Sequence, residues 1–160
     1  MELQKRKPTR LARYDYSRPG AYFVTICTEG RRKILSNIVG EGLCALPKAD
    51  LTPIGQQVAD AISYMGRAYE GVSVDGFVIM PNHVHLLLLI HEAGGHGGPP
   101  LQQIIGRFKS YTTHLYGGQL WQRSFHDHVI RGEDDLRAVR EYIAHNPARW
   151  REDELYSETF

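Results

Sequence analysis

Short runs of apolar residues mark four segments of this chain as β-strands, because the runs are rich in aromatic, β-branched or leucine residues and end at turn residues. The strands are expected within residues 21–30, 72–81, 83–90 and 120–132. The segment 31–47 holds shorter apolar pieces that are broken by glycines, which predicts at most a weak further strand.

Three other segments have apolar residues three or four positions apart, the spacing of an amphipathic helix. They are residues 51–70, 101–117 and about 134–146. Thr52 is expected to cap the first helix, with Pro53 at the first helical position. Pro147 disfavours further α geometry and therefore predicts the end of the third helix.

The order of these elements is strand, helix, strand, strand, helix, strand and a further helix. It predicts an α+β fold of the ferredoxin-like, split βαβ type, with an antiparallel sheet and an additional C-terminal helix that carries Tyr142. No repeat or linker divides the sequence, so residues 1–160 are expected to form a single domain. Residues 93–100 are rich in glycine and proline and predict a flexible loop.

The composition agrees with one globular domain. A chain of 160 residues can bury a sizeable core, and 42% hydrophobic with 23% charged residues is ordinary for a soluble protein. It holds no run of roughly 20 apolar residues that could cross a bilayer, and its first residues do not resemble a targeting signal. Two cysteines do not suggest a disulfide scaffold. We therefore expect a cytoplasmic protein with no membrane association.

The charge is distributed unevenly although the net charge is +1. Residues 1–20 form a basic N-terminal arm, and acidic residues gather between Glu133 and Glu158. The basic residues of the arm that we expect to contact a ligand are Lys5, Arg6, Lys7, Arg10 and Arg13. Such an arm suits a polyanion such as nucleic acid, although a solvated charge run would look the same.

Two histidines stand at the start of the apolar strand, in the sequence MPNHVHLLLLI. Successive side chains of a strand point to opposite faces, so His83 and His85 share one face and both rings can reach one ion. A metal site needs a further ligand. Without one, the two histidines would only form hydrogen bonds or contact water at a strand end.

The last helix offers further polar candidates. Tyr142 and Asn146 are four residues apart and are therefore neighbours on one face, beside the apolar stripe of the helix. Asn146 stands near the helix end, from which its amide oxygen could reach a metal. The alternative is a tyrosine at the edge of the core and an ordinary helix-terminal asparagine.

Four separated motifs together resemble a known family. They are RLARYDYSRPGAYFVTICT at residues 10–28, MPNHVHL at 80–86, WQRSF at 121–125 and REYIAHNPARW at 140–150. In this order they are similar to the IS200-type transposases, and most of all to the REP-associated tyrosine transposases, which are HUH single-stranded DNA endonucleases. The resemblance covers nearly the whole chain.

The resemblance implies roles for individual residues. The histidine pair of the family, on the central strand of a ferredoxin-like sheet, matches His83 and His85, and its nucleophilic tyrosine matches Tyr142. In related transposases a polar amide one helical turn after the tyrosine completes the metal site. Asn146 has that position here, in place of the more common glutamine.

The resemblance also implies an activity. It is that of a divalent-metal-dependent enzyme, with Mn²⁺ or Mg²⁺, that cleaves and rejoins single-stranded DNA beside a REP-like hairpin through a 5′-phosphotyrosine intermediate. Imidazole would also accept zinc. The family includes both dimers and monomers, so a monomer or a homodimer is expected.

Further residues are candidates for contacts with DNA. Arg107, Lys109 and Tyr111 combine charge with a stacking ring, as proteins that bind unpaired bases do. Arg123 is another candidate, whereas Phe108 and Trp121 are more typical of core packing.

The sequence bears on two other functions. A histidine-triad nucleotide hydrolase would need a further histidine at the position of Leu87. A DNA-hairpin-binding regulatory protein without catalytic activity would not need His83, His85 and Tyr142, all of which are present.

Overall fold

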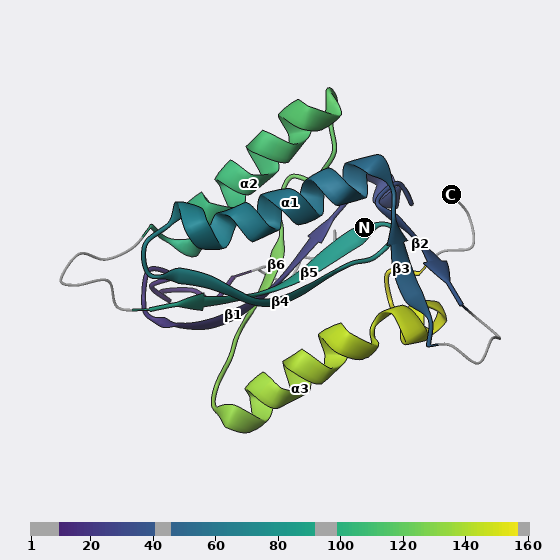
Figure 1. Ribbon diagram of the computed structural model, residues 1–160. Coiled ribbons are helices and arrows are strands. Elements are labelled where there is room, and N and C mark those ends of the chain that lie inside the picture. Colours follow the sequence, from purple (N-terminus) through teal and green to yellow (C-terminus); the bar gives the residue numbers. More distant parts are fainter. Residues whose placement is uncertain (1–9, 41–45, 92–98, 157–160) are drawn as a thin grey trace, which may run out of the picture.

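A computed structural model describes residues 10–40, 46–91 and 99–156 of the chain (Figure 1). Lys5, Arg6 and Lys7, and most of the loop expected at 93–100, lie outside these described residues. The strands are β1 (Gly20–Cys27), β2 (Ser36–Val39), β3 (Lys48–Leu51), β4 (Val72–Ile79), β5 (His83–Ile90) and β6 (His126–Val129). The α-helices are α1 (Pro53–Ala68), α2 (Leu101–Tyr116) and α3 (Glu133–His145), and the 3₁₀ helices are η1 (Glu29–Arg31) and η2 (Pro147–Glu152).

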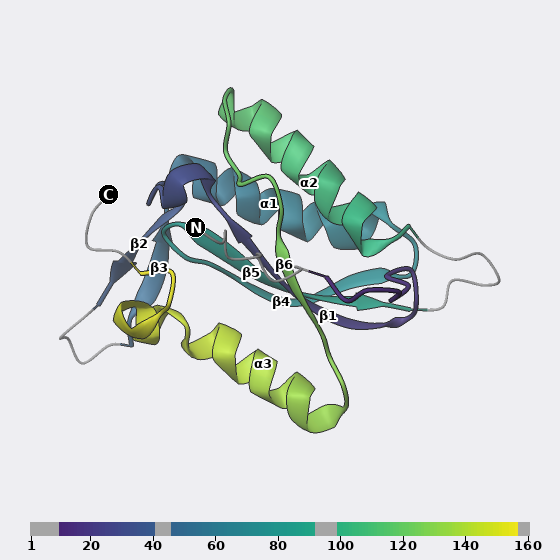
Figure 2. The same cartoon turned by 180° about the vertical axis from the view of Figure 1, so that it is seen from behind.

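The main sheet has four strands in the order β4-β5-β1-β6, and every neighbouring pair is antiparallel. Helices α1 and α2 cover one face of this sheet, and α3 lies on the other (Figures 1 and 2). This strand order and these crossovers are those of a ferredoxin-like fold with one additional helix. The fold predicted from the sequence is therefore confirmed.

The segment before α1 differs from the prediction. The weak strand expected within residues 31–47 is β2, but it pairs with β3, which was not predicted, as a separate antiparallel two-stranded sheet. β3 has the sequence KADL, which is too short and too polar to signal a strand by its pattern. Helix α1 starts directly after it: the side chain of Thr52 accepts a hydrogen bond from the Gly55 amide (3.1 Å), which confirms the predicted cap.

Strand β5 is buried on both of its faces. Val84, Leu86 and Leu88 belong to the large core between the sheet and the helices α1 and α2. Leu87 points the other way and packs with Val139 of α3. Alternation along the strand places His83 and His85 on the face of Leu87, under α3. The long apolar run of β5 thus reflects a strand that is covered from both sides.

Polar contacts also hold α3 against the sheet. A register shift in β4 between Val74 and Gly76 leaves Asp75 as an extra residue. The Asp75 carboxylate accepts two hydrogen bonds from Arg140, from Nε (2.8 Å) and Nη2 (2.9 Å). Because Arg140 lies two residues before Tyr142, this pair fixes the helix near the tyrosine.

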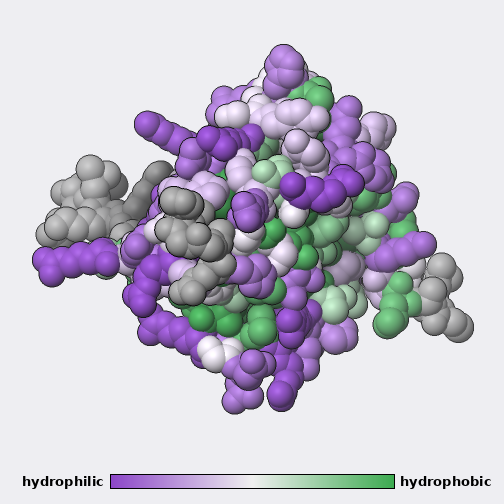
Figure 3. Space-filling view, turned by 60° about the vertical axis from the view of Figure 1, so that its left-hand side comes forward, coloured by the Kyte–Doolittle hydropathy of each residue, from purple (hydrophilic) through white to green (hydrophobic). Residues whose placement is uncertain are grey.

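Figure 3 shows one face on which hydrophilic side chains surround smaller hydrophobic areas. In the part of the chain that the structure describes, every helix is too short or too polar to traverse a bilayer.

Candidate metal centre and tyrosine

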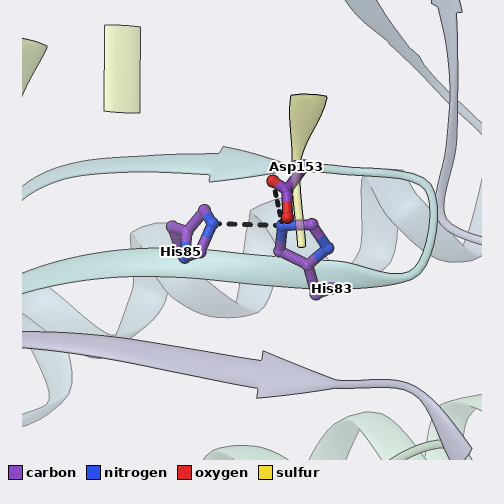
Figure 4. A group of neighbouring side chains, drawn as sticks. All are labelled: His83, His85 and Asp153. Carbon is purple, nitrogen blue, oxygen red and sulfur yellow. Dashed lines mark hydrogen bonds and ion pairs between the residues drawn. The ribbon is translucent and has the colours of Figure 1, made fainter. Parts of the chain in front are cut away.

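The histidine pair lies where β5 begins, directly after the turn that leaves β4. The Met80 amide donates a hydrogen bond to the His83 carbonyl (2.9 Å), which closes this turn. Across the strand pair, His83 is opposite Cys27 and His85 is opposite Thr25 of β1. The two rings converge, with Nε2 of His83 and Nε2 of His85 3.1 Å apart (Figure 4).

Asn82 fixes the chemical state of His83. Its Nδ2 donates a hydrogen bond to the Leu155 carbonyl (2.8 Å), so its Oδ1 faces Nδ1 of His83 (2.7 Å). An amide oxygen only accepts hydrogen bonds, and Nδ1 must therefore carry the ring proton. The Nε2 atom of His83 then directs a lone pair toward His85, which is the form that binds a metal.

His85 is held from two sides. Its Nδ1 lies 2.8 Å from the hydroxyl of Thr25, and its ring stacks on Phe23 with centroids 5.2 Å apart. Burial lowers the pKa of His85 to about 3, and the adjacent His83 ring acts in the same direction because two positive charges so close together are unfavourable. The imidazole is therefore neutral near pH 7, as a metal ligand must be.

Asp153 is a member of this cluster that the sequence did not indicate. It follows η2, and its Oδ2 lies 3.5 Å from Nε2 of His83 (Figure 4). Burial alone would raise the pKa of this carboxyl. The contact with the His83 ring, the hydrogen bond that the carboxylate accepts from the Leu155 amide (2.8 Å) and the nearby imidazoles outweigh burial and lower the pKa. The carboxylate is thus ionised beside two neutral nitrogen donors.

These three side chains fit a divalent cation. Donor atoms of His83, His85 and Asp153 all lie within 4.8 Å of one another. Two Nε2 atoms at 3.1 Å repel unless a proton or a cation lies between them, and this is a spacing that two nitrogens on one metal can have with bonds of about 2.1 Å. Nitrogen and carboxylate donors together suit Mn²⁺, Mg²⁺ or zinc.

Asn146 borders the cluster. Its Nδ2 lies 3.4 Å from Oδ2 of Asp153, and its Oδ1 is buried without a hydrogen-bond partner among the described residues. A buried, unpartnered carbonyl oxygen is costly unless something binds it. Its position beside the carboxylate is compatible with the ligand role predicted from the sequence, which stays a prediction.

Tyr142 lies over the same cluster. Its ring meets His85 edge to face at 5.2 Å between centroids and Phe23 at 5.9 Å. The side chain is 41% exposed, so a substrate can reach it. Burial of the remainder and the negative charge of Asp153 raise the pKa of Tyr142, and the Asn146 amide opposes this change. Without added positive charge, the phenol thus keeps its proton at neutral pH.

The tyrosine and the metal cluster open into one cavity of about 670 Å³. Besides His85, Tyr142 and Asp153, its lining includes the side chains of Arg31, His126 and Arg149. None of these last three was predicted as a site residue from the sequence, although His126 and His128 form a second His-x-His pair there. Arg31 adopts a left-handed backbone (φ 53°), which is uncommon for a residue other than glycine. Strained conformations of this kind gather at functional sites.

The other residues predicted to contact DNA lie away from this cavity. Arg107 and Tyr111 line a separate hollow of about 710 Å³ between α1 and α2, on the opposite side of the sheet. Lys109 donates hydrogen bonds to the carbonyls of Gln122 (2.6 Å) and Arg123 (3.0 Å). The structure therefore does not bring these residues to the histidine pair.

The start of the described chain lies along the edge strand β6. Arg10 stacks over Phe125 at 4.2 Å and has its Nε 3.9 Å from the buried Asp127 carboxylate. Arg13 and Arg123 are exposed. Phe108 and Trp121 are buried against each other, as expected of core residues.

Fold and site together define a class of protein. It has a ferredoxin-like antiparallel sheet, a histidine pair on a central strand with a carboxylate beside it, and an accessible tyrosine on a helix that packs over the pair.

Comparisons with known proteins show which proteins this chain is similar to. No protein-family model matches the chain. An uncharacterised protein of Haemophilus influenzae is 29% identical over 176 residues, covering 96% of this chain and 94% of the relative. A second H. influenzae protein, provisionally named a REP-associated tyrosine transposase, is 25% identical over 150 residues, covering 86% of this chain and 75% of the relative.

A solved structure has the same fold. It is that of a REP-associated tyrosine transposase bound to a REP hairpin, with a TM-score of 0.64 and 23% identity, covering 88% of this chain and 73% of that one. The resemblance to REP-associated tyrosine transposases that the sequence motifs indicate is therefore confirmed.

Proposed function

We propose that this protein is a metal-dependent single-stranded DNA endonuclease and transposase that cleaves and rejoins DNA beside hairpin elements. The observation that carries the proposal is the meeting of Tyr142 with the His83–His85–Asp153 cluster in one open cavity. The similarity to a transposase whose structure contains a REP hairpin supports a hairpin as the DNA partner. A DNA substrate agrees with the cytoplasmic localisation that the sequence predicts.

The cluster would hold one divalent cation, Mn²⁺ or Mg²⁺. His83, His85 and Asp153 would be its ligands, and Asn146 would add a further donor through its unpartnered Oδ1. When bound, the cation supplies positive charge that polarises the scissile phosphodiester.

Tyr142 is the nucleophile. Its oxygen attacks the phosphorus, the bond from phosphorus to the 3′-oxygen breaks, and the 5′-phosphate of the downstream strand stays on the tyrosine. One phosphodiester replaces another, so the reaction can be reversed by a new 3′-hydroxyl. A tyrosine therefore suits cleavage followed by rejoining.

Arg31 and Arg149 would bind phosphates on either side of the scissile bond. Both line the cavity and are exposed. Guanidinium groups bind phosphate oxygens in pairs of hydrogen bonds, which fixes the backbone for attack. The basic N-terminal arm and the α2 residues Arg107, Lys109 and Tyr111, together with Arg123, would contact the DNA outside the cavity, as the sequence predicts.

The test is covalent capture of DNA. Purified protein is mixed with Mn²⁺ or Mg²⁺ and a panel of imperfect DNA hairpins with single-stranded flanks, each labelled at its 3′ end. Because the protein keeps the downstream fragment, a 3′ label reports the adduct on a denaturing gel, and a 5′ label reports the released strand.

Tyr142→Phe should abolish the adduct and leave hairpin binding within about twofold, because only the nucleophilic oxygen is lost. Tyr64→Phe is the matched control, since Tyr64 is also an exposed tyrosine on a helix (60%) but lies on α1. A phenylalanine variant at position 142 that still forms the adduct would exclude Tyr142 as the nucleophile. A wild-type protein that binds hairpins but never forms an adduct would identify a non-catalytic binding protein.

A further inference from the structure

A row of three side chains crosses the sheet beneath the cavity. Thr25 of β1 is opposite His85 of β5 on one side and opposite His126 of β6 on the other. Directly opposed residues of antiparallel strands point to the same face. Since Thr25 contacts His85 on the α3 face, His126 also faces α3.

This row leaves room for a substrate between two imidazoles. His85 and His126 are two strand spacings apart, about 9.5 Å, and the short Thr25 side chain forms the floor between them. Both histidines line the same cavity as Tyr142. A phosphodiester placed over Thr25 would have the metal cluster on its β5 side and His126 on its β6 side.

The reaction proposed above needs a proton donor that the cluster does not provide. Breaking the bond from phosphorus to the 3′-oxygen creates an alkoxide, and a positioned proton donor speeds its departure. Arginines hold their protons at all accessible pH values, and carboxylates have lost theirs at neutral pH. Imidazole exchanges a proton near neutrality. Among the described residues that line the cavity, His126 is the one imidazole outside the metal cluster.

We propose that His126 is a catalytic residue that protonates the leaving 3′-oxygen, an inference that rests on the proposed function. As the Tyr142 oxygen bonds to phosphorus, its own proton passes to water in the open cavity. The electron pair of the breaking bond goes to the 3′-oxygen, which takes a proton from His126. In the rejoining step the neutral His126 accepts the proton of the incoming 3′-hydroxyl, so one residue serves both directions.

A sulfur leaving group tests this role directly. The hairpin that the wild-type protein cleaves is prepared a second time with sulfur in place of the bridging 3′-oxygen at the scissile position. A thiolate is a stable leaving group without a proton donor, since thiols ionise near pH 8.5. Adduct formation with Mn²⁺ is then measured for both substrates with wild-type protein, His126→Asn and His126→Gln.

The expected result is a selective loss. Both variants should form the adduct about 10²–10⁴-fold more slowly than wild type on the oxygen substrate, and within about tenfold of wild type on the sulfur substrate. His128→Asn is the matched control, because His128 is on the same face of β6 but is held by Asp135 (2.9 Å) and does not line the cavity. It should react at the wild-type rate within about threefold. Circular dichroism of all variants checks folding, which the exposed position of His126 should preserve.

Two kinds of result would overturn the proposal. Equal losses on both substrates would mean that His126 does not act on the leaving group, and no loss on the oxygen substrate would mean that it has no catalytic part. Either result leaves the proposed function intact, because the wild-type protein still forms the adduct. A wild-type protein that forms no adduct on any hairpin would overturn both.

Discussion

At the scale of single residues, the properties of the site depend on neighbours that are not ligands themselves. Asn82 directs the proton of His83 to Nδ1, and Thr25 contacts the same nitrogen of His85. As a result, the two Nε2 atoms face each other, and the Asp153 carboxylate lies beside them. Such outer partners tune a metal site because they set the orientation and the protonation of its ligands.

The role of Asp153 can be tested by removing its charge alone. Asp153→Asn keeps the size of the side chain but replaces a carboxylate oxygen by a neutral amide, so Mn²⁺ affinity should fall by at least about 10- to 100-fold. Isothermal titration calorimetry with Mn²⁺ measures this change. Glu154→Gln is the control, since the adjacent Glu154 is exposed and outside the cluster. Equal affinities for wild type and Asp153→Asn would remove Asp153 from the ligand set.

At the scale of elements, the position of Tyr142 depends on how α3 is held to the sheet. Leu136, Val139 and Ile143 pack the helix against the sheet around Leu87. Apolar packing can tolerate small rotations of a helix, whereas a two-pronged ion pair fixes direction. The bulge at Asp75 of β4 supplies that pair to Arg140. The tyrosine helix is therefore oriented by an irregular position in the sheet.

This tether should make part of the stability depend on pH. The hydrogen bonds from Arg140 lower the pKa of Asp75 from its ordinary value of 3.8. A lowered folded-state pKa stabilises the protein above the unfolded-state pKa, and this stabilisation is lost as the pH falls through the folded-state value. Asp75→Asn should therefore lower the melting temperature by about 1–4 °C near pH 7 and by much less near pH 3, as measured by circular dichroism.

The control for that measurement is Asp50→Asn, on the exposed side of β3. It should change the melting temperature little at either pH. The contrary result is that Asp75→Asn lowers the melting temperature as much near pH 3 as near pH 7. That result would show that Asp75 does not stabilise the protein through its ion pair with Arg140.

At the scale of the whole molecule, one chain brings together both halves of the site. Tyr142 of α3 and His85 of β5 are in ring contact within a single copy of the protein. We therefore expect that each chain uses its own tyrosine, whether the protein is a monomer or a dimer.

Mixing two inactive variants tests this expectation. His83→Ala lacks a metal ligand, and Tyr142→Phe lacks the nucleophile. If the helix were exchanged between subunits, a mixed dimer would contain one intact site and the adduct would return. With each tyrosine acting in its own chain, the mixture should stay as inactive as either variant alone. The gel assay for the covalent adduct reads out both cases, and a restored adduct would contradict the expectation.

The spacing of hydrophobic residues along the sequence predicts most of the helices and strands. The alternation and spacing of apolar residues depend on local geometry, which is why the strands, the cap at Thr52 and the ferredoxin-like order follow from the sequence. It indicated β2 only as a weak strand and missed β3, because four-residue strands such as KADL carry too little pattern. That His83 and His85 share one face of the sheet also follows from the sequence, because side chains of a strand alternate with a period of two residues.

Tertiary structure decided which other groups meet that pair. Asp153 comes from an irregular segment after η2, and His126 reaches the cavity only because β6 pairs with β1. Asp153 has no periodic signal. His126 forms a second His-x-His pair with His128, but its place beside the first pair depends on contacts between residues far apart in the chain. The sequence by itself thus determined the elements and the histidine face. Which side chains surround that face was determined by strand pairing and by the path of the C-terminal segment, because these are set by packing over the whole molecule.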